Sequence, residues 1–306
     1  MRTRALAAGL SVAAAFLWAT YYVFILSLSA TPTAVAVVFY PFVFGGLGYL
    51  VWIAFAGHAR SFVQVWREPL SYLRVALLVG MQFSVVAATY LLGPVDASLL
   101  SLVGDVVVTP LIVLAFFAPV GGAHQRAVFW VGLALAAAGG SLTIVGGATV
   151  RPVAGLGWLV AAIVPVTVAF YFLLTARANR GAPGPAVVGQ SLAAAAGATL
   201  VVAAVSPGGL GSLALGDARD LGLLALTGLT SFTLAPALYF SSIERVGLFL
   251  PALLMVTIPI FTLSLALALL GLVPPWAALA GIPIALAGAV AAASGEHEPW
   301  NRLPSS

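Results

Sequence analysis

Residues 88–110 read ATYLLGPVDASLLSLVGDVVVTP, and residues 237–259 read ALYFSSIERVGLFLPALLMVTIP. A shift of 149 positions, without a gap, places Ala88, Tyr90 and Pro110 of the first stretch on the same residue types in the second. The same shift matches further landmarks, namely Tyr22 with Tyr171, Gly48 with Gly197, Phe83 with Phe232, Gly132 with Gly281, and Gly139 with Gly288. Because internal repetition outranks local motifs in deciding a fold, the chain is predicted to contain two copies of one unit.

The repeated unit is almost wholly apolar. The chain has 306 residues, of which 62% are hydrophobic and 7% charged, and its mean hydropathy is +1.15. Because soluble domains carry about 25% charged residues, this composition predicts a protein of the lipid bilayer. The absence of cysteine excludes disulfides, thiol catalysis and thiolate metal sites. All 12 basic residues are Arg, and the net charge of +4 fits cytoplasmic membrane loops better than nucleic-acid binding.

The fold class is predicted to be all-α, a polytopic membrane protein with ten transmembrane helices. Each span is close to the ~20 residues that cross the hydrocarbon core. The predicted limits are 5–28, 33–56, 70–92, 97–119, 125–147, 153–176, 184–206, 219–241, 246–271 and 275–294. The first span is predicted to be retained, because its apolar run exceeds the roughly 7–15 residues of a signal peptide. Residues 1–149 form the first five-helix repeat, 150–295 the second, and 296–306 a cytoplasmic tail.

The arginines orient the chain. With a cytoplasmic N-terminus, Arg151 and Arg219 fall in outer loops, together with Asp217 and Asp220. The other arginines then lie in inner loops or tails: Arg2, Arg4, Arg60, Arg67, Arg74, Arg126, Arg177, Arg180, Arg245 and Arg302. This excess predicts that both termini are cytoplasmic. Since five spans is an odd number, the second repeat enters from the opposite side. Such inverted repeats around a central cavity are typical of secondary transporters, which bind substrate near the midplane.

Short motifs add a family resemblance. Residues 16–20 (FLWAT) resemble the Leu-Trp-Gly-Ser element of the EamA family, and so does the stretch 88–110 with Tyr90, its small residues near Ala97 and its final Pro110. The repeat-related stretch 237–259 and the Gly-rich fifth and tenth spans fit the same pattern. The chain therefore resembles the drug/metabolite transporter superfamily, and most of all bacterial aromatic amino acid exporters. The resemblance implies ten helices in two inverted repeats, a bacterial inner membrane, and export of small metabolites.

The chain also departs from that family. The acidic residue that usually follows the fourth and ninth spans is replaced by glycines at 121–122 and by Gly-Leu at 271–272. The Arg that the family often has in its second span is replaced by Tyr40-Pro41. These differences leave the family's charge coupling open for this chain.

Asp105 is predicted to be the only ionisable acid or base inside a span and away from its ends. On a helical wheel Ser98, Ser101, Asp105 and Thr109 lie within about 80° of one another, so they form a polar stripe on the fourth span. One interpretation is that the stripe lines a substrate cavity, where Asp105 holds an ammonium group or carries a proton. The other is that a protonated Asp105 bonds to a neighbouring helix as structural support.

Aromatic and amide side chains inside the spans complete the candidate site. Trp18 lies midway along the first span, unlike the other tryptophans, which lie near span ends or in the tail. The predicted substrate-binding residues are Trp18, Tyr22, Tyr40, Gln82, Ser98, Ser101, Asp105, Thr109, Tyr171, Gln190, Ser231 and Tyr239. Flat aromatic walls with few charges suit an apolar zwitterion or a flat organic cation. Helix packing is the alternative role for each single aromatic.

Prolines within spans suggest bends. Pro110 and Pro259 are repeat-related, and we expect them to act as hinges of the fourth and ninth helices or, alternatively, to fix a static curvature. The Gly-rich fifth and tenth spans are expected to serve as scaffold or dimer contact, because small residues let helices approach closely.

Motifs of enzymes and ATP-driven pumps are absent from the sequence. It contains no Walker motif, no His-Glu-x-x-His and no Gly-x-Ser-x-Gly, so no catalytic residue and no cofactor are predicted. His58, His124 and His297 are too scattered for a metal site. The predicted function is a secondary transporter that exports amino acids, above all aromatic or apolar ones, by alternating access. A passive small-solute channel and a lipid-linked metabolite flippase are the alternatives. The expected partners are the small-molecule substrate and the lipid bilayer, with no nucleic acid, and the oligomeric state stays open.

Overall fold

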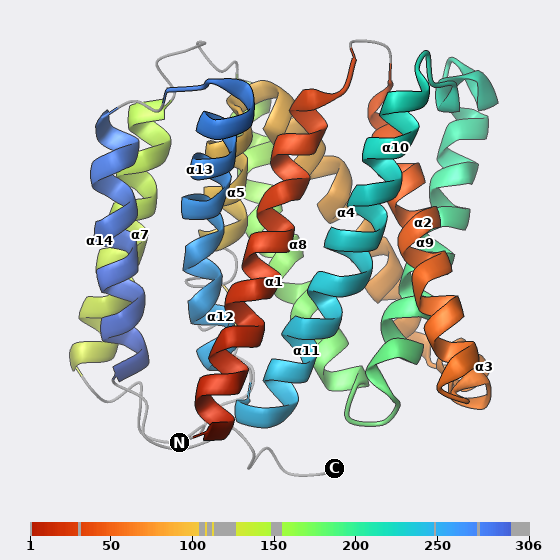
Figure 1. Cartoon of the computed structure of the whole chain (residues 1–306), viewed down its shortest axis with the longest axis horizontal. Helices are drawn as coiled ribbons and strands as arrows, with labels where there is room; N and C mark the ends of the chain where they lie inside the picture. The colour runs from red at the N-terminus through yellow and green to blue at the C-terminus, as the bar shows by residue number, and fades with distance from the viewer. Residues whose placement is uncertain are drawn as a thin grey trace.

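A computed structural model describes residues 2–29, 32–103, 108, 112, 127–147, 155–247, 249–273 and 276–294. Long helices run side by side between two ends of the molecule (Figure 1), and the described residues contain no strand. The helices of the first half are α1 (Arg2–Ser27), α2 (Ala34–Phe55), α3 (Ala59–Val65), α4 (Pro69–Leu92), α5 (Pro94–Val103) and α7 (Ala127–Gly147). Those of the second half are α8 (Gly155–Ala178), α9 (Gly184–Val205), η4 (Gly209–Leu213), α10 (Ala218–Thr227), η5 (Gly228–Leu234), α11 (Ala235–Val246), α12 (Phe249–Leu254), η6 (Met255–Thr257), α13 (Ile258–Leu270) and α14 (Trp276–Ser294).

These helices follow the predicted spans closely where both can be compared. The second and seventh predicted spans, 33–56 and 184–206, correspond to α2 and α9 within one residue at each end. The eighth span is longer than predicted, since α10, η5 and α11 continue to Val246. The fourth predicted span, 97–119, begins in α5 and otherwise lies largely outside the described residues.

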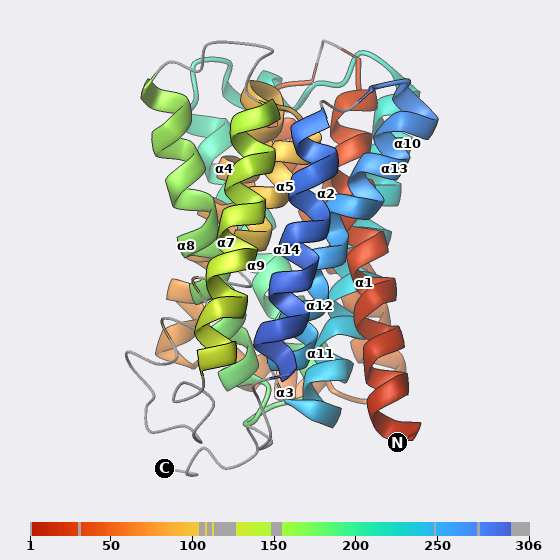
Figure 2. The same ribbon diagram turned by 90° about the vertical axis from the view of Figure 1, so that its left-hand side faces the viewer.

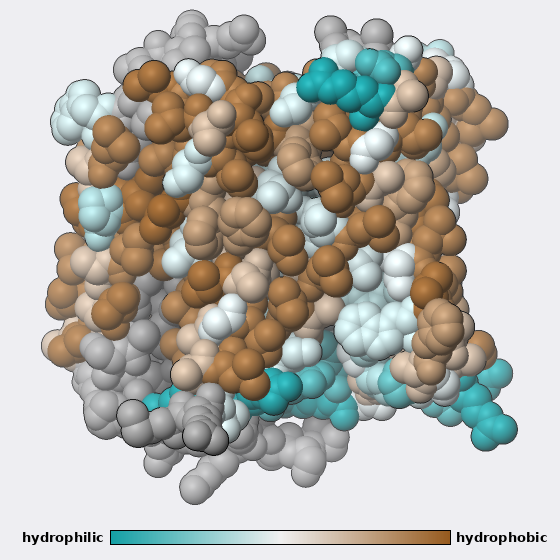
Figure 3. Space-filling view, viewed as in Figure 1, coloured by the Kyte–Doolittle hydropathy of each residue, from teal (hydrophilic) through white to brown (hydrophobic). Residues whose placement is uncertain are grey.

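Six helical runs in the described part of the chain are long and apolar enough to cross a membrane. They are Thr3–Ser27, Ala34–Phe55, Pro69–Leu92, Gly184–Val205, Ala218–Val246 and Leu250–Leu270. Large apolar side chains such as Phe55, Val205 and Val273 are exposed on the outside of the bundle. Figure 3 shows apolar surface over the middle of one face, with hydrophilic residues at the two ends. The chain is thus an all-α membrane protein with several spanning helices.

The described ends of the chain lie together. Helix α1 begins and helix α14 ends at the lower end of the bundle in Figures 1 and 2. We call this the basic end, because the helix termini and loops there carry arginines, namely Arg2, Arg4, Arg60, Arg67, Arg74, Arg177, Arg180 and Arg245. Among the described arginines, Arg219 alone belongs to the opposite end, at the start of α10.

Helices α7 and α14 lie side by side (Figure 2), and their backbones come close together at two glycines. A Cβ added to Gly139 of α7 would overlap the backbone of Gly281 and Ala285 in α14. A Cβ added to Gly288 of α14 would overlap the backbone of Gly132 and Ala136 in α7. Each residue of the second contact is 149 positions from its counterpart in the first, so the two contacts are reciprocal.

The central helices are joined by close backbone approach and by hydroxyl hydrogen bonds. A Cβ on Gly189 of α9 would fall 2.9 Å from the Cβ of Tyr49 in α2, so these helices also pack closely. On α1, Ser11 donates to Ser242 of α11 at 2.8 Å, and Ser242 donates to the carbonyl of Ala7 at 2.8 Å. Hydroxyls that bond across helices satisfy polar groups that lipid cannot.

Two helices are interrupted next to a proline. The π-helical segment η5 precedes Pro236, whose missing N–H cannot bond the carbonyl of Phe232, so the helix ladder shifts there. The 3-10 turn η6 precedes Pro259 in the same way, so the ninth helix is interrupted where a hinge is predicted. Its predicted counterpart, Pro110, lies outside the described residues.

Candidate functional site

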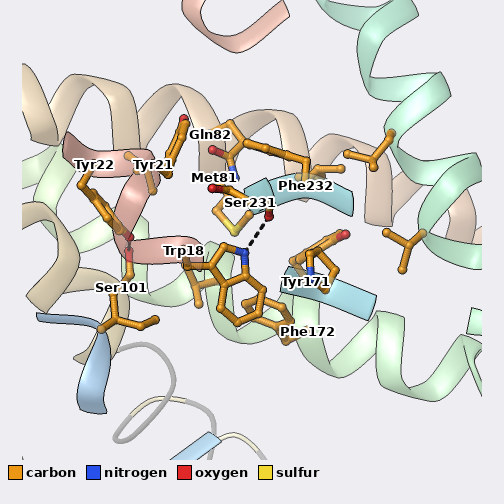
Figure 4. A pocket seen from close by; sticks show the side chains of 17 residues that line it. Trp18, Tyr21, Tyr22, Met81, Gln82, Ser101, Tyr171, Phe172, Ser231 and Phe232 are labelled. Atoms are coloured by element: carbon orange, nitrogen blue, oxygen red, sulfur yellow. Dashed lines mark hydrogen bonds between the residues drawn. The ribbon is translucent and has the colours of Figure 1, made fainter. Parts of the chain in front are cut away.

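A cavity of ≈ 70 Å³ lies between the two halves of the chain (Figure 4). The first half lines it with Trp18, Tyr21 and Tyr22 of α1, Leu78, Met81, Gln82 and Val85 of α4, and Ser101 of α5. The second half lines it with Val168, Tyr171 and Phe172 of α8, Val188 and Leu192 of α9, Ser231 and Phe232 of η5, Pro236 of α11 and Ile258 of α13. No Asp, Glu, Lys, Arg or His is among these lining residues.

Aromatic rings form much of the cavity wall. The indole of Trp18 lies edge-on to the ring of Phe172, with 5.6 Å between ring centroids, and to that of Tyr239, at 5.2 Å. Its Nε1 donates to the carbonyl of Ser231 at 2.9 Å, the bond drawn in Figure 4. Ser231 in turn donates to the carbonyl of Leu17 at 2.8 Å. These bonds between α1 and η5 fix Trp18 in the wall.

A few polar atoms break this apolar lining. The hydroxyl of Tyr22 donates to Ser101 Oγ at 2.7 Å. The Oε1 atom of Gln82 and the hydroxyl of Tyr21 are buried, and neither has a hydrogen-bond partner in the described part of the chain. Figure 4 shows Tyr21 and Gln82 next to each other along the cavity. Because a buried polar atom without a partner costs about 1–3 kcal/mol, these two positions suit a polar group of a bound molecule or water.

The arrangement suits the binding of a small molecule. An apolar, aromatic cavity with a few convergent polar groups is the usual form of a small-molecule site. The described residues contain no group of three or more His, Cys, Asp or Glu that could hold a metal ion. The volume of ≈ 70 Å³ is small beside the roughly 300–1,000 Å³ of ligand pockets, so a molecule of amino acid size requires the walls to move apart.

Half of the predicted binding residues line this cavity. They are Trp18, Tyr22, Gln82, Ser101, Tyr171 and Ser231. Two of the lining pairs, Tyr22 with Tyr171 and Gln82 with Ser231, are related by the 149-residue shift. Asp105 and Thr109, also predicted, lie outside the described residues.

Four predicted binding residues lie elsewhere. Tyr239 packs behind the wall, against Trp18 and Phe172. Ser98 is buried within the bundle one turn of α5 before Ser101, and it does not line the cavity. Tyr40 donates to the carbonyl of Leu213 at 3.0 Å, near the opposite end of the bundle. The remaining residue is the buried Gln190, whose amide oxygen accepts a hydrogen bond from Arg74 at 3.0 Å instead of facing the cavity.

Several lining residues escape the sequence analysis although their spacing indicates them. Tyr21 shares a helix face with Trp18 at i and i+3, and Phe172 directly follows Tyr171. Phe232 directly follows Ser231 in the middle of η5, the π-helical segment before Pro236. The four lining residues of α4 likewise recur at helical spacing, with Gln82 as their polar member.

The gap-free shift between the repeats does not hold at the end of the third helix. Tyr90 lies two residues before the end of α4 and is 43% exposed. Its sequence counterpart Tyr239 lies seven residues before the end of α11 and is 1% exposed. The two tyrosines therefore occupy different levels of their helices, because the eighth span continues to Val246.

Two charged residues that the sequence assigns to loops are buried in the bundle. Arg74, in the second turn of α4, contacts Glu68 at 3.3 Å and donates to Ser191 and Gln190 of α9. Asp220, in the first turn of α10, accepts hydrogen bonds from the backbone N–H of Ser29 at 3.0 Å and from its hydroxyl. Sequence position near a span end did not reveal that these side chains turn inward.

Comparison with protein-family models gives no match, and comparison with curated proteins gives none. Comparison with solved structures matches almost the whole chain. One solved structure, described only as "Crystal structure of protein", superposes with a TM-score of 0.70 at 20% identity, over 94% of this chain and 96% of its own. At this identity the likeness concerns the fold alone.

Proposed function

We propose that the protein is a secondary transporter that exports amino acids, above all aromatic and apolar ones, across the inner membrane of a bacterium by alternating access. The observation that carries this proposal is the cavity between the halves, with aromatic walls and two buried polar atoms that have no partner among the described residues. Transporters built from inverted repeats bind substrate at such a repeat interface.

Two inverted five-helix repeats are the architecture that we propose around this cavity. The reciprocal contact between α7 and α14 supports it, because Gly139 and Gly288 meet each other's repeat-related partners. The two helices run antiparallel in Figures 1 and 2. A pseudo-two-fold axis in the membrane plane produces this combination of reciprocal contact and opposite direction.

The arginines support an orientation. We propose that the basic end faces the cytoplasm, since cytoplasmic loops of membrane proteins carry the excess of arginine. Both termini would then be cytoplasmic, and transport would be outward from the basic end. Asp217 and Arg219, both exposed at the start of α10, would lie on the outer side.

The size of the cavity favours a carrier over a passive channel. A channel needs a continuous wet path or a ring of charges, whereas the lining residues that the structure describes carry no charged group. A cavity of ≈ 70 Å³ admits a few waters and requires rearrangement before an amino acid can enter. A cycle of opening and closing supplies that rearrangement, and it is the defining step of a carrier.

Counterflow in proteoliposomes tests this function. Vesicles loaded with unlabelled L-phenylalanine are expected to accumulate external labelled L-phenylalanine transiently and saturably, because a carrier exchanges one molecule for another. The substitution Trp276→Phe, at an exposed Trp of α14, provides a variant with the same wall and should behave as the wild type. Flux that stays proportional to concentration, without counterflow, would favour the channel, and no flux of any labelled amino acid would refute the proposal.

A further inference from the structure

Arg74 is a charged side chain of α4, the helix that lines the cavity with Leu78, Met81, Gln82 and Val85. It is fully buried, although it belongs to the second turn of a spanning helix, where arginines ordinarily reach outward to lipid head groups or water. An ionised side chain turned into a membrane bundle is costly and is retained where it has a task. Its position therefore calls for an explanation beyond the excess of arginine at the basic end.

Arg74 continues the row of cavity residues on α4. Leu78 follows it by four residues on the same helix face, about 6 Å along the axis, and Leu78 lines the cavity. On α9, the cavity residues Val188 and Leu192 flank Gln190 and Ser191, the two residues to which Arg74 donates. The guanidinium thus lies just below the cavity, toward the basic end.

The partners of this guanidinium leave it incompletely bound. Nε donates to Ser191 Oγ at 3.0 Å and one Nη to Gln190 Oε1 at 3.0 Å, and both acceptors are neutral. The other Nη reaches one oxygen of Glu68 at 3.3 Å, and the Glu68 side chain is 37% exposed. Because a guanidinium carries five N–H donors, two of them have no acceptor in the described part of the chain. A planar fork with two neutral partners, one partly exposed carboxylate and two vacant donors can bind a further carboxylate, which accepts two parallel bonds.

We infer that Arg74 binds the carboxylate of the transported molecule at the basic end of the cavity, in exchange for Gln190 and Ser191. This inference rests on the proposed function and names the substrate class, which is molecules that combine a carboxylate with an apolar or aromatic body. The sequence alone leaves open a flat organic cation, and Arg74 disfavours that class by charge. The side-chain body of the substrate would occupy the apolar wall above, where Leu78 and Tyr171 lie.

The bonds from Arg74 to Gln190 and Ser191 also stabilise the closed arrangement of α4 and α9 when no substrate is bound. Separating α4 from α9 would remove the two neutral partners of Arg74 and leave it with Glu68 alone, a partly exposed carboxylate at 3.3 Å. A carboxylate replaces them with charge-assisted bonds, which are roughly twice as strong as neutral ones. Opening at the basic end is thereby coupled to the arrival of an anionic group.

Ligand-induced thermal stabilisation of the purified wild-type protein tests the inference without any variant. The probes are 3-phenylpropionate, which has the carboxylate and lacks the amine, and L-phenylalaninamide, which has the amine and lacks the carboxylate. We expect 3-phenylpropionate to bind roughly tenfold to a hundredfold more tightly, because the bond to Arg74 is charge-assisted. Equal stabilisation by the two probes, or stabilisation by the amide alone or by neither, would overturn the inference.

Variants separate recognition from structural support. Arg74→Gln should weaken 3-phenylpropionate roughly tenfold or more and leave the much weaker L-phenylalaninamide unchanged, whereas Arg74→Lys should lose less, because it keeps the charge without the fork. Arg67→Gln removes an exposed arginine at the same end and should change neither. An equal loss for both probes in Arg74→Gln would assign Arg74 a structural role and overturn the inference. Because binding is measured apart from transport, wild-type counterflow of phenylalanine decides the proposed function separately.

Discussion

The α7–α14 contact and the cavity wall are both places where the two halves of the chain meet, and they differ in how closely the halves agree. In the contact, the repeat-related residues are identical in type, as Gly139 and Gly288 illustrate. In the wall, the repeat-related Tyr22 and Tyr171 are identical in type. The repeat counterpart of Gln82 is Ser231, which also lines the cavity, whereas the counterpart of Trp18 is Thr167, which does not.

The difference follows from what each region packs against. A helix that packs on its own repeat partner meets the same backbone twice, so a Cβ excluded on one side is excluded on the other. In the proposed transporter, a cavity shared by both halves is filled once, by a molecule that has no two-fold symmetry. Its wall is free to differ between the halves, and Trp18 and Gln82 are two of the positions at which it does.

The largest effect is expected where the halves agree. Gly288→Ala places a methyl group on the backbone of Gly132 and Ala136, and neither can yield without moving α7. We expect a loss of about 3 kcal/mol of stability, at the upper end of overpacking costs, measured as thermal unfolding in detergent. The matched change Gly197→Ala in α9 adds a methyl group with nothing within 4 Å and should be neutral or stabilising. If both variants unfold at the same temperature, the close contact is not what holds α7 to α14.

A smaller effect is expected from the wall of the cavity. Trp18→Phe removes the bond from Nε1 to the carbonyl of Ser231 and shortens the aromatic wall. We expect a loss of about 1–3 kcal/mol in unfolding free energy together with a raised KM for phenylalanine counterflow. Trp276→Phe, at a residue that is 77% exposed, is the control for the loss of an indole. An unchanged KM in Trp18→Phe would remove this residue from the site.

The smallest effect on stability, and one of opposite sign, is expected at Gln82. Gln82→Leu removes a buried Oε1 that has no partner in the described residues, so the empty protein should be unchanged or about 1 kcal/mol more stable. Counterflow of phenylalanine should nevertheless fall, because the substrate loses a hydrogen-bond acceptor. Gln64→Leu, at an exposed position of α3, should change neither quantity. A loss of both stability and transport would indicate that Gln82 supports the fold rather than the substrate.

The spans were predictable because few backbone structures can cross a bilayer. A run of about 20 apolar residues bounded by Gly or Pro has to be a helix there, so α2 and α9 fall within a residue of their predicted limits. Local irregularities were not predictable to the same degree. Pro236 indicated a bend, yet only packing decides that the ladder widens into a π-helix before it and that the span reaches Val246.

The site was predictable to the extent that helical spacing shows a shared face. Trp18 and Tyr22 on α1 and Ser101 on α5 line the cavity as spacing predicts. Gln190 is predicted at the substrate because a buried amide needs a partner, and in the structure that partner is Arg74. That bond depends on how α4 approaches α9, which no pattern along either helix records.

The most direct test of two oppositely oriented halves around one cavity is a pair of distance measurements between spin labels. Since the chain has no cysteine, Leu70→Cys with Ala182→Cys reports the basic end, and Ala34→Cys with Ala218→Cys reports the opposite end. Addition of phenylalanine to the protein in lipid is predicted to shift the two distance distributions in opposite directions, one lengthening as the other shortens. Distances that lengthen together, or that stay fixed while counterflow proceeds, would contradict alternating access.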